Sequence, residues 1–264
     1  MLKIKGIFKT FNAGTVNEKI ALQGVDLHLK EGDFVTVIGG NGAGKSTLLN
    51  SIAGAYDVDD GNIFIDDVNV THLPEYKRAR LIGRVFQDPM MGTAATMQIE
   101  ENLALALRRG KVRTLRSGIT NTERQMFREQ LKILDLGLED RMTAKVGLLS
   151  GGQRQALTLL MATLQKPKLL LLDEHTAALD PKTASKVLEA TQKIVGANNL
   201  TTLMITHNMR DAIAYGNRLI MMYDGRIVVD ISGEDKKKLT VEQLLDLFSK
   251  ASGSDEANDK MLLS

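Results

Sequence analysis

A glycine-rich loop joins two apolar segments and has the sequence Gly39-Gly40-Asn41-Gly42-Ala43-Gly44-Lys45-Ser46-Thr47. The segment before it, Phe34 to Ile38, is short, apolar and rich in β-branched residues, which predicts a buried strand. The segment after it, Leu48 to Ala53, has the spacing of a helix. This order of strand, loop and helix is the context in which the pattern Gly-x4-Gly-Lys-Ser/Thr binds phosphate.

The residue types in this loop suit a nucleotide. Glycines allow successive backbone N–H groups to point at one phosphate group, and the N-terminus of the following helix adds a partial positive charge. Lys45 can then neutralise the β and γ phosphates, and the Ser46 hydroxyl can coordinate Mg²⁺. A glycine-rich turn without a ligand is the alternative, which the flanking strand and helix argue against. We therefore expect a nucleotide site at residues 39–47.

The composition of the chain excludes several classes of function. The 264 residues suffice for a full core, and 34 basic and 32 acidic side chains give a formal net charge of +2. This balance gives no overall electrostatic case for nucleic-acid binding. The chain has no cysteine, which excludes disulfides and thiolate metal sites and fits a reducing compartment. The apolar run Leu169 to Leu172 is too short to cross a bilayer, and the first nine residues alternate like a strand and not like a signal peptide. Any membrane role would therefore come through a partner.

Periodicity and turn signals divide the chain into α and β segments. Strands are predicted over residues 2–9, 20–29, 34–38, 61–65, 81–86, 168–172 and 200–206, with a hairpin over 218–231. The first five would form one mixed sheet around the loop. Helices are predicted from Ser150, from Asp180 to Gly196 and over residues 240–249. We predict a single α/β domain over residues 1–250, with a helical part of about 88–150 inserted in it, and a mobile tail over 251–264. A basic stretch, Arg108 to Arg116, is interpreted as a solvated loop, with contact to anionic lipid as the alternative.

An acidic pair, Asp173-Glu174, follows the apolar strand Leu169 to Leu172. A carboxylate at the end of a strand beside the loop strand can hold Mg²⁺, which suits Asp173. Glu174 would project toward the γ-phosphate and orient the attacking water. By itself such a pair is more often a helix cap than a catalyst. The glycine-rich loop in the same chain favours the catalytic interpretation.

A second short motif, Leu149-Ser150-Gly151-Gly152-Gln153, matches letter for letter the signature of the ABC transporter ATPase family. The chain resembles this family from about Leu2 to Ile231, with the other motifs in the family's order. The resemblance implies a Walker A motif at residues 39–47, a Q-loop glutamine at Gln87, a Walker B motif with its catalytic glutamate at residues 169–174, a D-loop at residues 178–180 and a switch histidine at His207. It also implies the fold of a P-loop ABC ATPase, with a RecA-like core sheet, an antiparallel β subdomain and an inserted α-helical subdomain.

The same resemblance implies a role for each site residue. The catalytic residues would be Lys45, Gln87, Glu174 and His207, and the Mg²⁺ site would use Ser46, Gln87 and Asp173. ATP would be bound by Phe11 stacking on adenine, by residues 39–47, and by Ser150, Gly151, Gly152 and Gln153. A lone histidine after a strand is more often a satisfied polar residue, and only the series of motifs favours a catalytic His207. The chain departs from the usual family pattern at Gly40, His175 and Phe11, where proline or serine, proline and tyrosine are common.

The family resemblance also implies partners. Ser150 to Gly152 and the glycine-rich loop are two anion sites, which in the family bind one ATP from different subunits, so we expect a head-to-tail homodimer. Integral membrane permease chains and an external solute-binding protein would complete a transporter at the cytoplasmic face of the cell membrane. ATP hydrolysis to ADP and phosphate would then power uptake. The stretch from Asp173 to Pro181 resembles the ATPases of importers for amino acids and other small organic solutes.

Three other functions remain as alternatives. An exporter would use the same ATPase. A soluble ABC-type ATPase acting on DNA or ribosomes would carry long coiled coils or a second cassette, and the chain shows neither. A P-loop kinase or GTPase would leave the signature motif unexplained, and the chain lacks the Asn-Lys-x-Asp motif that reads a guanine base.

Overall fold

The computed structural model describes residues 1–111 and 118–252. The predicted tail, apart from the backbone of its first two residues, and residues 112–116 of the basic stretch lie outside this part of the chain. The ten strands of the described part are β1 (Leu2–Phe11), β2 (Lys19–Leu29), β3 (Phe34–Ile38), β4 (Asp60–Ile65), β5 (Val68–Asn69), β6 (Ile82–Val85), β7 (Leu169–Asp173), β8 (Thr201–Ile205), β9 (Arg218–Tyr223) and β10 (Arg226–Ser232). The nine α-helices there are α1 (Lys45–Ala53), α2 (Glu75–Arg78), α3 (Ile99–Leu107), α4 (Asn121–Lys132), α5 (Gly151–Thr163), α6 (Pro181–Asn198), α7 (Met209–Ala214), α8 (Gly233–Lys237) and α9 (Val241–Ser252).

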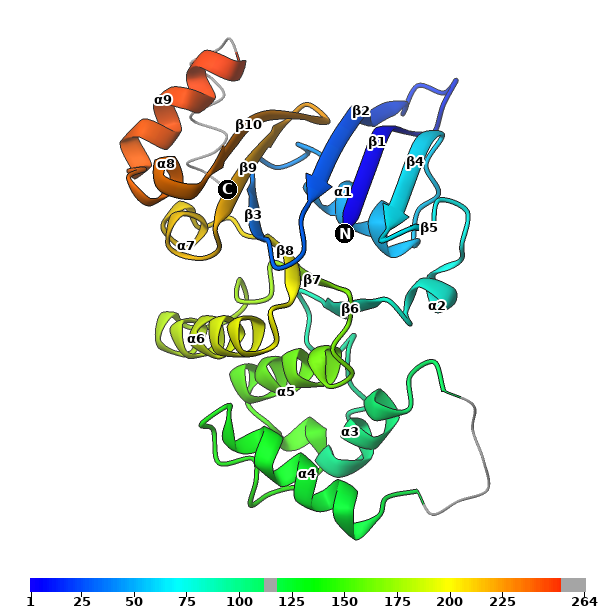
Figure 1. Cartoon of the computed structure of the whole chain (residues 1–264), viewed down its shortest axis with the longest axis vertical. Helices are drawn as coiled ribbons and strands as arrows, with labels where there is room; N and C mark the ends of the chain where they lie inside the picture. Colours follow the sequence, from blue (N-terminus) through cyan, green and yellow to red (C-terminus); the bar gives the residue numbers. More distant parts are fainter. Residues whose placement is uncertain (112–117, 253–264) are drawn as a thin grey trace.

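A six-stranded sheet in the order β10-β9-β3-β8-β7-β6 forms the centre of the molecule (Figure 1). Strands β6, β7, β8, β3 and β9 are parallel, and only β10 runs antiparallel. Every residue of β3 is buried, as expected for a strand covered on both faces. Because parallel strands end at one edge of a sheet, the residues after β3, β6, β7 and β8 meet there. This edge receives the glycine-rich loop, Gln87, Glu174 and His207.

A second, antiparallel sheet has the order β2-β1-β4-β5. The prediction of one mixed sheet for the first five strands is therefore wrong, because β3 and β6 pair with later strands of the chain. Helix α1 lies between the two sheets. Its Leu49 belongs to one buried apolar cluster together with Ile7 of β1 and Leu171 of β7. This packing fixes the glycine-rich loop, which leads into α1, against both sheets.

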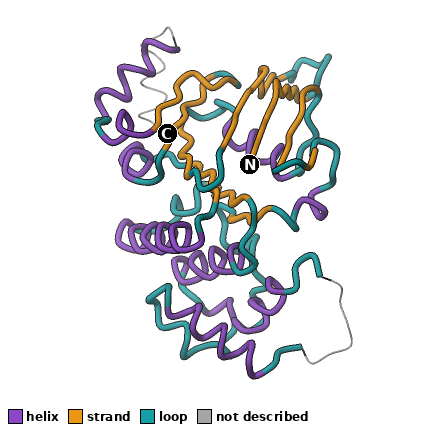
Figure 2. The backbone as a smooth tube through the Cα atoms, viewed as in Figure 1, coloured by secondary structure: helices purple, strands orange, loops and turns teal. Residues whose placement is uncertain are grey.

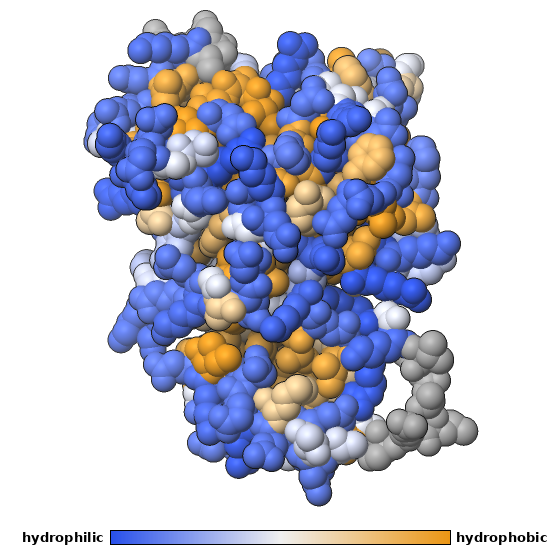
Figure 3. Space-filling view, in the orientation of Figure 1, coloured by the Kyte–Doolittle hydropathy of each residue, from blue (hydrophilic) through white to orange (hydrophobic). Residues whose placement is uncertain are grey.

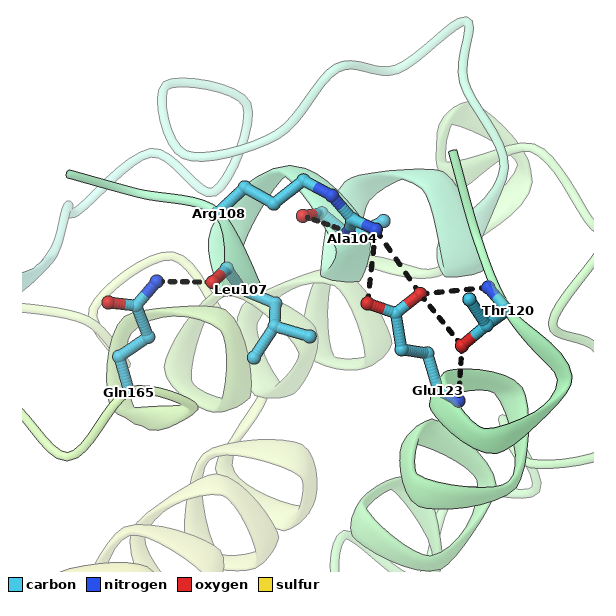
Figure 4. A network of polar contacts seen from close by, with 6 residues as sticks. All are labelled: Ala104, Leu107, Arg108, Thr120, Glu123 and Gln165. Atoms are coloured by element: carbon cyan, nitrogen blue, oxygen red, sulfur yellow. Dashed lines mark hydrogen bonds and ion pairs between the residues drawn. The ribbon is translucent and has the colours of Figure 1, made fainter. Parts of the chain in front are cut away.

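Helices α3, α4 and α5 gather on the side away from the antiparallel sheet (Figures 1 and 2). A capping box at Thr120 and Glu123 begins α4, and Arg108 at the end of α3 donates to the same Glu123 carboxylate at 3.0 and 3.2 Å (Figure 4). This shared carboxylate ties α3 to α4. Helices α3 and α4 lie within residues 88–150, whereas α5 begins at Gly151, and an inserted helical part over about 88–150 stays a prediction.

Helix α6 continues two residues beyond its predicted end. Asn199 at φ 48° takes the left-handed position that ends it, and not Gly196, whose place in the last turn is helical. Asparagine tolerates the left-handed conformation better than most residues, so it can end a helix in place of glycine. The prediction that the helix ends at Gly196 is therefore wrong.

Helices α8 and α9 cover the β9–β10 end of the central sheet (Figure 1). Leu244 and Phe248 of α9 are buried with Leu219 and Met221 of β9. The face of the molecule in Figure 3 is mainly hydrophilic, with separate apolar patches surrounded by polar residues. Within residues 1–111 and 118–252, no helix combines the length and the apolar content needed to span a bilayer.

Candidate nucleotide-binding site

A cavity of about 440 Å³ opens at the carboxyl edge of the central sheet. The residues that line it are Phe11, Lys19, Ala21, Asn41, Gly42, Ala43, Gly44, Lys45, Ser46, Thr47, Gln87, Glu174 and His207. The structure thus brings together predicted residues from the first strand, the glycine-rich loop and three strand ends. A volume of this size suits a small-molecule ligand.

The glycine-rich loop has its shape because side chains are excluded from it. Gly39 has φ 152°, and a Cβ atom there would lie 2.3 Å from the Met222 carbonyl oxygen. Gly44 has φ 99°, and its Cβ would lie 2.5 Å from the Ala21 carbonyl oxygen. Both positions therefore need glycine, for conformation as well as for space. Gly40 is not among the left-handed glycines, so this departure from the family pattern leaves the loop conformation accessible to other residues.

Lys45, the first residue of α1, folds back over the loop. Its Nζ donates hydrogen bonds to the carbonyl oxygens of Gly39 at 2.6 Å and Gly40 at 3.2 Å. Burial lowers the pKa of the ammonium group, and the carboxylates of Glu174 and Asp173 oppose this effect. A buried cation held by carbonyl groups alone can exchange these contacts for the stronger ones of an anionic ligand.

Glu174 follows the last residue of β7 in an unusual backbone conformation. Its φ of 46° lies in the left-handed region, and its N–H donates to the Ile205 carbonyl oxygen at 3.1 Å. Such a conformation costs free energy in a non-glycine residue and is concentrated at functional sites. It directs the carboxylate into the cavity, where Oε2 lies 2.5 Å from Nε2 of His207. A carboxylate and an imidazole in contact can exchange or orient a proton.

The cavity also offers oxygen donors of the kind that Mg²⁺ prefers. Ser46 and Gln87 line it directly, whereas Asp173 lies one residue behind Glu174 and outside the lining. Burial raises the pKa of Asp173, and the guanidinium of Arg84 opposes this effect. In the described part of the chain, no three His, Cys, Asp or Glu side chains cluster as a metal site. One carboxylate with a hydroxyl and an amide fits an ion whose other ligands are phosphate and water.

The signature residues do not line this cavity. Ser150 and Gln153 form a capping box at the start of α5, with hydrogen bonds of 3.2 and 3.3 Å, as the sequence predicts. A Cβ at Gly152 would lie 1.9 Å from Cγ2 of Thr183, so this glycine also permits close contact between α5 and α6. Ser150 and Gly151 are exposed. Ser150, Gly151, Gly152 and Gln153 are thus absent from the lining of the cavity that the loop of their own chain forms.

Two lining residues, Lys19 and Ala21, were not predicted. Lys19 stands opposite Phe11 in the β1–β2 register, and both lie just outside the predicted strands 2–9 and 20–29, so antiparallel pairing continued beyond these bounds is the signal that could have found it. The Phe11 ring meets the Tyr56 ring edge-on, with 5.3 Å between centroids. His175, the third departure, is buried, pairs with Thr191 Oγ1 at 3.1 Å and has its pKa lowered by burial to about 4. It is thus a neutral part of the core.

Comparisons with known proteins agree with this geometry. The family model described as ABC transporter matches residues 22–177. The tyrosine transport ATP-binding protein of Clostridioides difficile is 45% identical over 251 residues, which cover 95% of this chain and 100% of that protein. A methionine import ATP-binding protein of Streptococcus pneumoniae is 35% identical over 91% of this chain and 68% of its own length. A dimeric ATP-binding cassette in a post-hydrolysis state, bound to ADP and Pi, is 32% identical with a TM-score of 0.75 and covers 88% of this chain and 98% of that one. The chain therefore belongs to the ABC transporter family, as an ATP-binding and ATP-hydrolysing subunit.

Proposed function

We propose that this chain powers the uptake of a small organic solute, such as an amino acid, by an ABC transporter. The observation that carries the proposal is the contact between Glu174 and His207 in the cavity of the glycine-rich loop. A base, a phosphate-binding loop and a buried lysine in one cavity are what phosphoryl transfer to water requires. Similarity to a tyrosine transport protein at 45% identity supports an amino acid as the cargo.

In the proposed reaction, the loop residues hold the nucleotide and its phosphates. Phe11 stacks on the adenine, and the N–H groups of residues 39–47 surround the β-phosphate. Lys45 leaves the carbonyl groups of Gly39 and Gly40 to neutralise the β and γ phosphates. Glu174 orients and deprotonates the attacking water, while His207 contacts the γ-phosphate and holds the Glu174 carboxylate in place.

Ser46, Gln87 and Asp173 would hold Mg²⁺ beside the phosphates. The ion supplies charge neutralisation on the β and γ oxygens when bound. Ser46 lies in the first turn of α1, and Gln87 lies two residues beyond β6. A change at the phosphates would therefore alter contacts with two different parts of the fold. Gln87 also begins the connection to the helical region, which suits it to transmit the state of the nucleotide to that region.

The proposed active unit is a head-to-tail homodimer. Ser150, Gly151, Gly152 and Gln153 of one copy would cover the ATP that the other copy holds in its loop. The support is twofold: these residues do not line the cavity of their own chain, and a similar cassette is dimeric. ATP would then join the two subunits, and hydrolysis would let them separate.

A groove beside the helical region is the proposed contact with the permease. It has a volume of about 540 Å³ and lies between α2 and β6 on one side and α3 and α5 on the other. Its wall includes Tyr76, Phe86, Leu105 and Met161, which offer apolar surface to a helix. A cytoplasmic helix of the permease would occupy it, with the chain at the inner face of the cell membrane and an external solute-binding protein delivering the cargo.

Two other assignments use the same ATPase. An exporter subunit would carry the same cavity and groove. A soluble ATPase acting on DNA or ribosomes would need further elements to reach its substrate, and the name of the methionine import relative favours uptake.

Co-purification tests the proposed function. The chain, tagged at its N-terminus, is isolated from native membranes in mild detergent, and the associated proteins are identified by mass spectrometry. Recovery of a multi-span permease, lost when Leu105 in the groove is changed to Glu, supports the assignment. Recovery of ribosomes or DNA, or of no membrane protein, contradicts it.

A further inference from the structure

Arg84 lies in β6, the edge strand of the central sheet, and the other three residues of this strand are buried. It stands opposite Leu171 of β7 in the register, and its neighbour Ile82 packs in the apolar cluster around α1. Side chains two residues apart on a strand share a face. Arg84 therefore projects on the α1 side, and so does Asp173, two residues after Leu171.

The guanidinium of Arg84 contacts three other elements and the Phe86 ring just beyond β6. Its Nη2 donates to Oδ1 of Asn50 on α1 at 2.6 Å and lies 3.7 Å from Oδ2 of Asp173. Its Nη1 lies 3.9 Å from Oε1 of Glu75 on α2. Its Cζ stands 4.4 Å from the centre of the Phe86 ring, a cation–π contact. Only 13% of the Arg84 side chain and 15% of the Asp173 side chain are exposed, so the two charges interact with little screening by water.

Arg84 lies beside Asp173 and contacts the helix that carries Ser46, and these are two of the three proposed metal ligands. Asn50 follows Ser46 by four residues on α1, which puts the two side chains on one face of the helix. The hydrogen bond to Asn50 thus fixes the guanidinium between the helix that carries Ser46 and the strand that carries Asp173. At 3.7 Å the carboxylate is attracted but not hydrogen-bonded, so Oδ1 and Oδ2 keep their lone pairs for another ligand.

A comparison with Arg78 argues against a purely structural role. Arg78 is also buried, and it donates four hydrogen bonds to the carbonyl oxygens of Leu73, Ser51, Ile52 and Thr71. Arg84 makes one hydrogen bond, faces two carboxylates, and has an Nε that is buried without a partner among the described residues. An arginine that only filled space would be expected to satisfy its donors as Arg78 does.

We propose that Arg84 is a positioning residue for the metal site: it holds the Asp173 carboxylate beside α1 in the orientation that receives Mg²⁺ together with the nucleotide. The inference rests on the proposed function, in which Asp173 is a metal ligand. Partners of metal ligands orient them, and their loss typically lowers metal affinity about 10- to 100-fold. Arg84 and Phe86 also line the groove described above, so a segment seated there lies against the group that holds Asp173.

The test measures binding and not turnover. The dissociation constant of fluorescent, non-hydrolysable AMP-PNP is determined for the purified chain in EDTA and in saturating Mg²⁺. The constant in EDTA divided by the constant in Mg²⁺ is the ratio that reports how much the metal strengthens nucleotide binding. Arg84→Met is expected to lower this ratio about tenfold, with little change of the constant in EDTA. Arg84→Lys keeps the charge but loses the fork that reaches Asn50 and Asp173 together, so it is expected to recover only part of the ratio.

Three variants make the outcome decisive. Arg124→Met removes an arginine that pairs with the buried Glu100 in the helical region, 3.0 Å away, and should leave the ratio unchanged. Asn50→Ala removes the hydrogen bond to the guanidinium but keeps Arg84 and the backbone carbonyl that caps α1, and it should lower the ratio. This variant serves as the test if Arg84→Met does not fold. Asp173→Asn should lower it as well.

The two proposals fail in different ways. If Asp173→Asn lowers the ratio and Arg84→Met leaves it unchanged or raises it, the positioning role is wrong and the metal role of Asp173 stands. If Asp173→Asn leaves the ratio unchanged, Asp173 is not a metal ligand, and both the proposed metal site and the inference on Arg84 are wrong.

Discussion

Nε2 of His207 lies 2.5 Å from Oε2 of Glu174, across the gap between the carboxyl ends of β8 and β7. The two side chains come from neighbouring parallel strands, and the left-handed backbone at Glu174 turns its carboxylate toward the imidazole. Nδ1 of His207 is buried and without a hydrogen-bond partner among the described residues. The imidazole is thus held at one nitrogen by the glutamate, beside the cavity that the loop forms.

His207→Ala should lower kcat about 100-fold or more while ATP still binds, because the variant loses the group that orients Glu174. The measurement is steady-state phosphate release together with nucleotide binding at equilibrium. His72→Ala removes an exposed histidine far along the chain and serves as the control. A His207→Ala variant with wild-type kcat would remove His207 from the reaction.

Lys45→Ala should weaken ATP binding itself, by about 1.5–3 kcal/mol, the range for a hydrogen bond to a charged group. The loss should be smaller for ADP, which lacks the γ-phosphate. Both constants can be measured by calorimetry, with Lys132→Ala as the control because Lys132 pairs with the exposed Glu129. Unchanged ATP affinity in Lys45→Ala would show that this lysine does not contact phosphate.

Phe11→Ala should weaken ATP binding by about 1–3 kcal/mol, the range for stacking of one base on an aromatic ring. The ring is supported by Tyr56 at its edge and by Lys9 Nζ, 5.6 Å from its centre, so it is presented to the cavity in a fixed orientation. Phe11→Tyr keeps the ring and should bind as wild type does. Equal affinities for all three proteins would place the adenine elsewhere.

Lys236 gives a pH dependence of stability. It is 2% exposed, and its Nζ donates to the carbonyl oxygens of Tyr215 and Gly216, while burial lowers its pKa from 10.5 to about 8. Between about pH 8 and 10.5 the unfolded chain binds a proton that the folded chain has released, so this group makes the protein more stable as the pH rises. The free energy of unfolding of the wild type should therefore increase relative to Lys236→Met over this range, by up to about 1.4 kcal/mol per pH unit.

Urea unfolding at several pH values measures this difference. Lys237→Met is the matched control, because the neighbouring Lys237 is exposed and pairs with Glu234 at the surface. Its difference from the wild type should stay flat over the same range. A flat difference for Lys236→Met as well would show that folding does not lower the pKa of Lys236.

The sequence predicted the parts of the site that depend on strand order. Gln87, Glu174 and His207 each follow a strand of a parallel sheet, so their meeting at one edge follows from the fold class. Lys19 was missed because it and Phe11 lie just outside the predicted strands, although they pair in consecutive strands. Arg84 could not be predicted, because its role depends on pairing between two strands far apart in the chain, β6 and β7. The same reason explains the wrong assignment of β3 and β6 to the first sheet, since local patterns do not say which strand is the neighbour. The end of α6 at Asn199 was missed because a nearby glycine gave the stronger local signal.

ATP-dependent assembly of Glu174→Gln tests the central claim most directly, that two copies enclose ATP between the loop of one and the signature of the other. The variant loses the base but keeps every binding residue, so it should be a monomer without nucleotide and a dimer with ATP and Mg²⁺ in analytical ultracentrifugation. Changing Ser150 to Arg in this variant should abolish the dimer without loss of ATP binding to the monomer. A Glu174→Gln protein that binds ATP and remains a monomer, or that still hydrolyses ATP at the wild-type rate, would contradict the account.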